Sequence, residues 1–182
     1  MAWEAAPRLA SQADPGRITH GDTMTLTALK ATPPASAAHA RITLPYPHFQ
    51  KLDNYPWKPW VMPGVAYKLL SINRRSGGFT CLLKVDPGTE APVHHHLGAI
   101  EVIVLEGDIY YERNDIGRPG DYMHEPAGDI HQPRSDGGCV LFCVFEGAIA
   151  GLGEDGNVVG IIDGRSMLEM ATRDGAAQHV HS

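Results

Sequence analysis

The alternation of apolar and polar residues along the chain favours short β-strands over helices. Residues 79–85 set larger apolar side chains against Thr80 and Lys84, which is the period-two pattern of a half-buried strand. Residues 100–105 form a nearly continuous apolar run, and residues 140–145 form another, as in buried strands. Strands at this spacing, with few helical patterns, predict an all-β fold, either an antiparallel barrel or a sandwich.

Short sequence motifs predict two turns between these strands and the start of a helix. Residues 106–108, Glu-Gly-Asp, separate two apolar runs so tightly that a hairpin with residues 109–112 is expected. Residues 154–157, Glu-Asp-Gly-Asn, give a second hairpin signal. Ser166 and Glu169 have the spacing of a capping box, so a short helix is expected to end the fold.

Amino-acid composition and hydrophobic pattern divide the chain into three parts. Residues 1–56 are rich in alanine and proline and are interpreted as a partly irregular N-terminal arm. Residues 57–175 hold the strand patterns and are expected to form one β-barrel domain. Residues 176–182 are expected to be a flexible tail, in which His179 and His181 repeat the His-x-His spacing without glycines around them.

Composition excludes several classes of function. The net charge is −6 and there is no stripe of Lys and Arg, which argues against nucleic acid and anionic membranes. No apolar run approaches the roughly 18 residues that span a bilayer, and the N-terminus lacks a signal-peptide pattern, so a cytoplasmic protein is expected. The odd number of cysteines predicts buried free thiols at Cys81, Cys139 and Cys143.

Two histidine clusters framed by glycines point to the chemistry. His94 and His96 would lie on one face of a strand and reach a single ion, whereas His95 would face the other way. His131 follows a Pro-Ala-Gly turn that can aim its side chain back into a barrel. Three neutral imidazoles with open positions suit a catalytic transition metal such as iron, zinc, copper or nickel.

The two clusters resemble the two signatures of the cupin superfamily, G-x5-H-x-H-x3,4-E-x6-G and G-x5-P-x-G-x2-H-x3-N. The first is matched by Gly88, His94, His96, Glu101 and Gly107, and the second by Gly120, Pro126, Gly128 and His131. The resemblance implies a single cupin barrel, also called a double-stranded β-helix or jelly roll, with metal ligands at His94, His96 and His131.

This chain departs from the cupin pattern at two positions. Glu101 is one residue too close to Gly107, and Ser135 stands where the final asparagine is expected. Counted back from Gly107, the position of the family's carboxylate ligand is Ile100, which cannot bind a metal. We therefore expect a three-histidine site without the usual glutamate, and leave open whether Glu101 or Glu112 joins it.

A closer resemblance concerns residues 88–171, in particular 94–100, 105–107, 120–128, 146–148 and 154–156. These segments look like the branch of cupins that contains 2,4′-dihydroxyacetophenone dioxygenase and acetylacetone dioxygenase. Such enzymes hold non-haem iron(II) through three histidines and use dioxygen to split a carbon–carbon bond beside a carbonyl. The resemblance implies the same for this chain: iron(II), with zinc, nickel, copper or manganese as alternatives, and a small aromatic hydroxyketone or β-diketone as substrate.

Further residues are candidates for the site. Glu112 is either a fourth ligand or nearby base, or a solvent-facing carboxylate beside Arg113. His124 is a candidate hydrogen-bond donor to bound substrate or oxygen. Large side chains are candidates to line the substrate pocket: Trp60, Phe79, Tyr110, Phe142 and Phe145.

Two other classes of cupin remain as alternatives. A zinc-holding sensor of the anti-sigma type carries H-x-H-x3-E, but the glutamate position here is Ile100. A metal-independent sugar-nucleotide epimerase or isomerase typically lacks a full histidine triad. For all of these classes a homodimer or homotetramer is expected, because small cupins often bury sheet edges between subunits, and the arm before Trp57 could cross to a neighbour.

Overall fold

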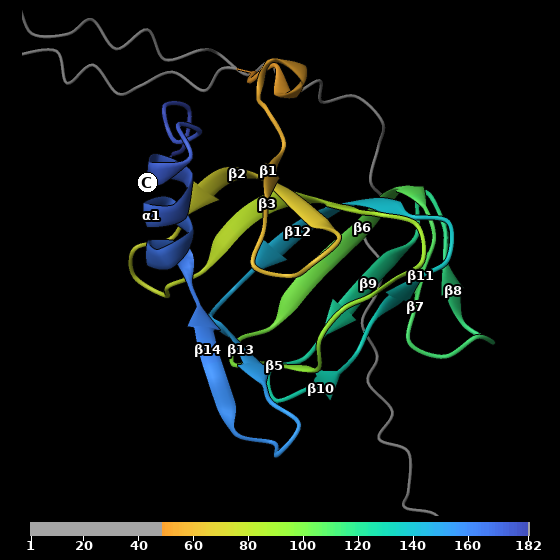
Figure 1. Ribbon diagram of the computed structural model, residues 1–182. Helices are drawn as coiled ribbons and strands as arrows, with labels where there is room; N and C mark the ends of the chain where they lie inside the picture. Colours follow the sequence, from red (N-terminus) through yellow and green to blue (C-terminus); the bar gives the residue numbers. More distant parts are fainter. Residues whose placement is uncertain (1–48, 182) are drawn as a thin grey trace, which may run out of the picture. The chain divides into compact units, whose positions relative to one another are not determined.

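The computed structural model describes residues 49–181, which form an antiparallel β-sandwich with one helix at its C-terminal end (Figure 1). Residues 1–48 of the expected arm, and residue 182, lie outside the described residues. Within the described range, no helix has the length and apolar character needed to cross a membrane.

Three antiparallel sheets build the sandwich. The largest has six strands in the order β1-β2-β3-β12-β6-β9: Lys58–Pro59, Val65–Ile72, Phe79–Val85, Cys139–Phe145, Ile100–Gly107 and Tyr122–Glu125. The second has the order β10-β5-β13-β14: Ile130–His131, His94–His96, Ile149–Leu152 and Val158–Ile162. The third has the order β4-β11-β7-β8: Thr89–Glu90, Arg134–Ser135, Ile109–Tyr110 and Ile116–Gly117.

The period-two pattern produces the core. Along β12 every second side chain is buried, and along the first half of β6 buried and exposed residues alternate. The inward sides meet in one hydrophobic cluster, where Tyr67, Leu69 and Cys143 are each 1% exposed. Each such large apolar side chain contributes roughly 1.5–3 kcal/mol on burial. The three cysteines are buried and free, as expected.

The C-terminal helix α1, Gly164–Arg173, begins earlier than the sequence predicts. Its N-cap is Asp163, whose carboxylate accepts a hydrogen bond from the backbone of Ser166 at 2.8 Å. The Ser166 hydroxyl in turn accepts one from the backbone of Asp163, so Ser166 closes the capping box instead of opening it. Met167 and Ala171 are fully buried in the core cluster, which fixes the helix against the sandwich.

One predicted hairpin is confirmed and the other is wrong. β13 and β14 pair antiparallel around the turn at 154–157. In contrast, β6 pairs with β12 and β9, whereas β7 pairs with β11 and β8, so Gly107 marks a corner where the chain changes sheets. The Asp108 carboxylate accepts hydrogen bonds from Ser135, Asp136 and Gly137, which holds the chain toward the third sheet.

Both ends of the described chain lie against β2. The 3-10 helix η1, Leu52–Asn54, receives a 2.7 Å hydrogen bond from Lys68 at the carbonyl of Leu52. The ring of His179 stacks on Tyr55 at 3.5 Å, and the carbonyl of His181 accepts from the backbone of Ile72 at 2.8 Å. The segments expected as the end of an arm and as a flexible tail thus contact the sandwich, and the tail histidines take part in this docking.

Candidate metal site

Two adjacent strands bring together the three histidines that the sequence singles out. In β5 the side chains of His94 and His96 are buried, with 5% and 2% exposed, while His95 between them faces the other side. β10 pairs with β5 so that His131 lies directly opposite His94. Because direct cross-strand partners share one face of a sheet, all three imidazoles enter the interior together.

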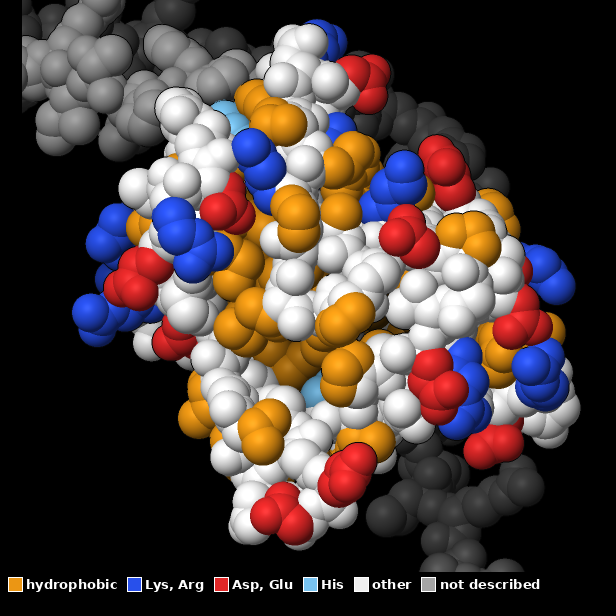
Figure 2. Space-filling view, in the orientation of Figure 1, with side chains coloured by type: hydrophobic (Ala, Val, Ile, Leu, Met, Phe, Trp, Pro, Cys, Tyr) orange, Lys and Arg blue, Asp and Glu red, His pale blue; other side chains and the backbone are white. Residues whose placement is uncertain are grey.

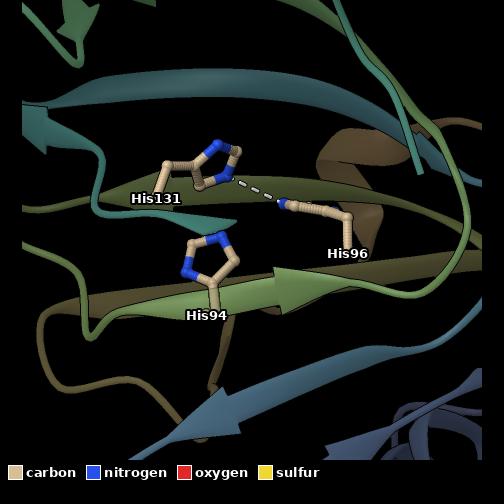
Figure 3. Close-up of side chains that lie close together, drawn as sticks. All are labelled: His94, His96 and His131. Atoms are coloured by element: carbon tan, nitrogen blue, oxygen red, sulfur yellow. Dashed lines mark hydrogen bonds between the residues drawn. The ribbon is translucent and has the colours of Figure 1, made fainter. Parts of the chain in front are cut away.

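The three rings converge on a small volume (Figure 3). Their candidate ligand nitrogens all lie within 4.8 Å of one another. The ring centroids are 4.8–5.0 Å apart and the rings are steeply inclined to one another, so their edges rather than their faces meet. This arrangement lets each ring offer one nitrogen to a common point.

The local backbone fixes the tautomer of His94. Its Nδ1 lies 2.8 Å from the carbonyl oxygen of Pro92. A carbonyl can only accept, so Nδ1 carries the proton and Nε2 keeps its lone pair. Burial lowers the pKa of His94 to about 4, although the hydrogen bond to Pro92 acts in the opposite direction. The ring is therefore neutral at pH 7, the state in which imidazole binds a metal.

His96 and His131 approach each other closely. Their Nε2 atoms are 2.9 Å apart (Figure 3). Two nitrogen lone pairs at this distance repel unless a proton or a cation lies between them. The other nitrogen of His96, Nδ1, is buried and has no hydrogen-bond partner among the described residues.

A carboxylate that the sequence analysis did not assign completes the cluster. Glu125, the last residue of β9, is 6% exposed, and its Oε2 lies 2.9 Å from Nε2 of His96 and 3.3 Å from Nε2 of His131. Burial alone raises the pKa of Glu125, but hydrogen bonds from His131 and His96 outweigh it and lower the pKa to about 2. At pH 7 the group is a carboxylate.

The pairing of β6 with β9 explains which acidic residues face the site. Ile100 lies opposite Glu125, and Glu101 lies opposite His124. Ile100 and Glu125 are buried and both line the cavity, whereas Glu101 and His124 are exposed on the outer side. Strand alternation thus turns Glu101 and His124 away from the histidines.

The structure places Glu112 outside the cavity as well. It is exposed, in the turn that follows β7, and is not among the residues that line the cavity. For Glu112 the solvent-facing alternative therefore fits its position. His124 is likewise exposed, and neither it nor Glu112 is among the residues that line the cavity.

Tyr111, next to Glu112, is the residue of this segment that faces inward. Its hydroxyl donates a hydrogen bond to Oε1 of Glu125. Its ring stacks on His131, with centroids 4.6 Å apart and an interplanar angle of 27°. Tyr111 thus contacts two members of the cluster. No sequence motif marked it or Glu125, because both contacts depend on which strands become neighbours.

Four residues of the cluster line an apolar cavity: His94, His96, Tyr111 and Glu125. Figure 2 shows a hollow lined by hydrophobic side chains with a histidine visible at its base. The cavity volume is about 70 Å³, which leaves room for a small molecule or a few waters. Apolar side chains form most of the lining, among them Trp60, Met62, Val65, Leu83, Val102, Leu141, Phe145 and Ile149.

Of the expected pocket residues, Trp60 and Phe145 line this cavity and three others do not. Phe79 lies behind Phe145, stacked on it at 4.2 Å. Tyr110 donates a 2.7 Å hydrogen bond to Asp136, away from the cavity. Phe142 falls on the opposite face of β12 from the lining residues Leu141 and Cys143. The sequence identified the aromatic residues but not which strand face is inside.

The residues present fit a transition metal ion. Imidazole nitrogens with a nearby carboxylate oxygen are the donors that iron, zinc, nickel, copper and manganese accept. Two buried imidazoles and the half-buried His131 leave positions for small ligands from the cavity side. The arrangement can therefore bind a metal and present it to a small molecule.

Comparison with known proteins agrees with this fold. Residues 47–150 match the family model described as the ChrR cupin-like domain. A cupin described as RmlC-like from Ralstonia eutropha JMP134 superposes with a TM-score of 0.63 at 24% identity, over 70% of this chain and 86% of that one. An acetylacetone dioxygenase from Acinetobacter johnsonii gives 0.63 at 17% identity, over 72% and 93% of the two chains. Among curated protein sequences no match was found.

Proposed function

We propose, from the premise that this chain belongs to the ChrR cupin-like domain family, that it is a non-haem iron(II)-dependent dioxygenase. Its substrate would be a small aromatic hydroxyketone or a β-diketone, and the reaction would cleave the carbon–carbon bond beside a carbonyl. The fold shared with acetylacetone dioxygenase supports the proposal, as does the resemblance of residues 88–171 to that branch of cupins.

One observation carries the proposal: the imidazoles of His94, His96 and His131 converge beside an apolar cavity that His94 and His96 line. His94, His96 and His131 would hold the ion through nitrogen. A bound iron(II) would supply positive charge that favours the enolate form of a ketone, together with electrons for dioxygen chemistry. His94 would bind without first releasing a proton, because burial keeps it neutral at pH 7.

The cavity walls would serve such a reaction in two ways, by excluding water and by holding the reactants close together. Apolar groups from Trp60, Leu141 and Phe145 exclude water, which strengthens the attraction between an anionic substrate and a positive centre. The restricted volume holds substrate and oxygen close together, so that proximity contributes to the rate.

The charge of the lining favours a neutral or singly charged substrate over a polyanion. Arg134 is the cationic side chain, apart from histidine, among the described lining residues. It is already paired with Glu90 at 2.7 Å and is 42% exposed, so it lies toward solvent. A sugar nucleotide would need more free cations than this cavity offers, which argues against the epimerase alternative.

A zinc-holding sensor is the second candidate, and the family match itself favours it. The matching family model is described as the ChrR cupin-like domain. Such a protein would hold its metal without turnover. Metal identity and oxygen uptake therefore separate the two candidates.

The test is oxygen uptake by the full chain loaded anaerobically with iron(II). The panel includes 2,4′-dihydroxyacetophenone, acetylacetone and, as a control, a simple ketone with neither a hydroxyl nor a second carbonyl. We expect an absorption change on anaerobic addition of a chelating ketone, and uptake once oxygen is admitted. Tight zinc binding with no uptake across the panel would replace the enzyme with the sensor.

A further inference from the structure

The position that should carry the carboxylate of this site carries isoleucine instead. Ile100 is 4% exposed and lines the cavity from β6. Its direct partner across the β6–β9 pairing is Glu125, which lines the same cavity. Cβ atoms of direct cross-strand partners are about 4.5–5.5 Å apart, so a glutamate on either strand reaches the same region.

We propose that Glu125 is the carboxylate of the metal centre, supplied by β9 in place of the β6 position that Ile100 occupies, and that Tyr111 holds it there. This inference rests on the proposed metal site and adds a fourth protein ligand to it. Neither the family match nor the histidine triad assigns a role to these two residues.

The spacing between side-chain atoms supports a shared ion. Two ligand atoms bound at about 2.1 Å and at right angles to each other lie about 3 Å apart. Oε2 of Glu125 is 2.9 Å and 3.3 Å from the Nε2 atoms of His96 and His131, which are themselves 2.9 Å apart. One cation stabilises all three contacts at once, whereas a single proton can bridge one pair only.

Tyr111 orients the carboxylate. By donating to Oε1 of Glu125 it occupies that oxygen and leaves Oε2 directed at the histidines. Its ring also stacks on His131, so one side chain positions two candidate ligands. Groups that hydrogen-bond to metal ligands typically change metal affinity by 10–100-fold when removed, although they do not touch the ion.

The experiment titrates cobalt(II) into the metal-free full chain and follows the Kd and the d–d absorption. Glu125→Gln keeps the shape of the side chain and removes its charge, and we expect a Kd about 100-fold higher with an altered spectrum. Tyr111→Phe keeps the stacking and removes the hydrogen bond, and we expect a Kd about tenfold higher. Far-ultraviolet circular dichroism checks that each variant is folded.

Matched controls come from residues that face away from the site. Glu101→Gln removes an exposed carboxylate on β6, and Tyr110→Phe removes a hydroxyl bonded to Asp136. Both should keep the wild-type Kd and spectrum. A double variant, Ile100→Glu with Glu125→Ile, tests the equivalence of the two strands. It should bind cobalt(II) within about tenfold of wild type, unlike Glu125→Ile alone.

Wild-type affinity and an unchanged spectrum in Glu125→Gln would overturn the proposal. A folded double variant that binds as weakly as Glu125→Ile would overturn the equivalence of the two positions. If the wild type binds cobalt(II) as expected but the iron(II) form consumes no oxygen, the dioxygenase proposal fails and this inference stands. If the wild type binds no cobalt(II), both fail.

Discussion

Burial of His94 couples the stability of the metal-free protein to pH. Its pKa is about 4 in the folded chain and 6.5 as a free side chain. Between these values the unfolded chain binds a proton that the folded chain does not, so stability falls as the pH falls. Glu125 has a folded pKa of about 2, compared with 4.5 for a free side chain. Its contribution to stability is therefore fully present above pH 4.5 and is lost only as the pH falls below that value.

The metal-free protein should therefore lose about 2 kcal/mol of unfolding free energy through His94 between pH 7 and pH 5. Urea unfolding at the two pH values measures this loss. His94→Gln cannot take up the proton and should show a correspondingly smaller difference between the two pH values. An equal pH dependence in variant and wild type would show that His94 titrates normally.

Each histidine of the cluster should be necessary for metal binding. His96→Ala should lower metal occupancy about tenfold or more after dialysis against iron(II) or zinc, while the sandwich stays folded because its core comes from other strand faces. His95→Ala is the matched control, since His95 lies on the opposite face of the same strand. Full loading of His96→Ala, by elemental analysis, would remove His96 from the site.

For individual residues, the sequence predicts those side-chain orientations that depend only on spacing along one strand. His94 and His96 share a face because they are two residues apart in a strand, and that prediction needs no tertiary information. Glu125 could not be assigned in this way, because its place beside His96 depends on the register of β6 against β9. Glu112 and Tyr111 are neighbours, and only the fold decides which of them faces inward.

Among the elements, the sequence misreads the corner at Gly107 and the start of α1, which Asp163 caps. The tight Glu-Gly-Asp connection resembles a hairpin turn, but the long β12 strand takes the place beside β6. That choice depends on contacts between residues far apart in the chain, whereas the turn at 154–157 is decided locally and was predicted correctly. The strand at 79–85 likewise follows from alternation alone, and those at 100–105 and 140–145 follow from their apolar runs.

Two glycines provide a matched test of this corner. Gly107 and Gly120 both have positive φ, +75° and +96°. A Cβ at Gly107 would lie 1.8 Å from the carbonyl oxygen of Gly138, whereas a Cβ at Gly120 meets nothing within 4 Å. Gly120→Ala should cost about 1 kcal/mol from its backbone conformation, and Gly107→Ala should cost at least about 2 kcal/mol more.

Thermal and urea unfolding of the two variants give the comparison. Gly107→Ala should be clearly the less stable variant, because the backbone of Gly138 cannot move aside as a flexible side chain would. Equal stabilities would mean that the β6–β7 connection is looser than described.

For the whole molecule, family and architecture were accessible from the sequence because glycine and histidine positions recur at fixed spacings. The shape of the cavity cannot be predicted from the sequence, because the residues that line it come from strands of all three sheets. The docking of residues 176–181 on β2 was also missed, because a short polar tail carries no periodic pattern.

The outer strand of the second sheet is a candidate contact between two copies of the chain. In β14, Val158, Val159 and Ile161 are 55%, 72% and 56% exposed, and within residues 49–181 no strand pairs with its outer edge. The strand also lacks charged residues, which usually protect such edges. We propose that two β14 strands pair antiparallel about a two-fold axis.

Light scattering at micromolar concentration tests this pairing. The wild type should be a dimer or a larger even-numbered assembly, and Val159→Lys should shift it toward monomer. Val61→Lys is the control, because Val61 is also exposed, at 52%, but lies outside the strands. A wild type that is monomeric at these concentrations would contradict the pairing.

The fate of oxygen tests the proposed reaction most directly. Turnover of the iron(II)-loaded full chain under ¹⁸O₂, with a chelating ketone as substrate, is followed by mass spectrometry of the products. We expect both atoms of one oxygen molecule in the cleavage products. Products without the label, or substrate recovered intact after oxygen exposure, would contradict it.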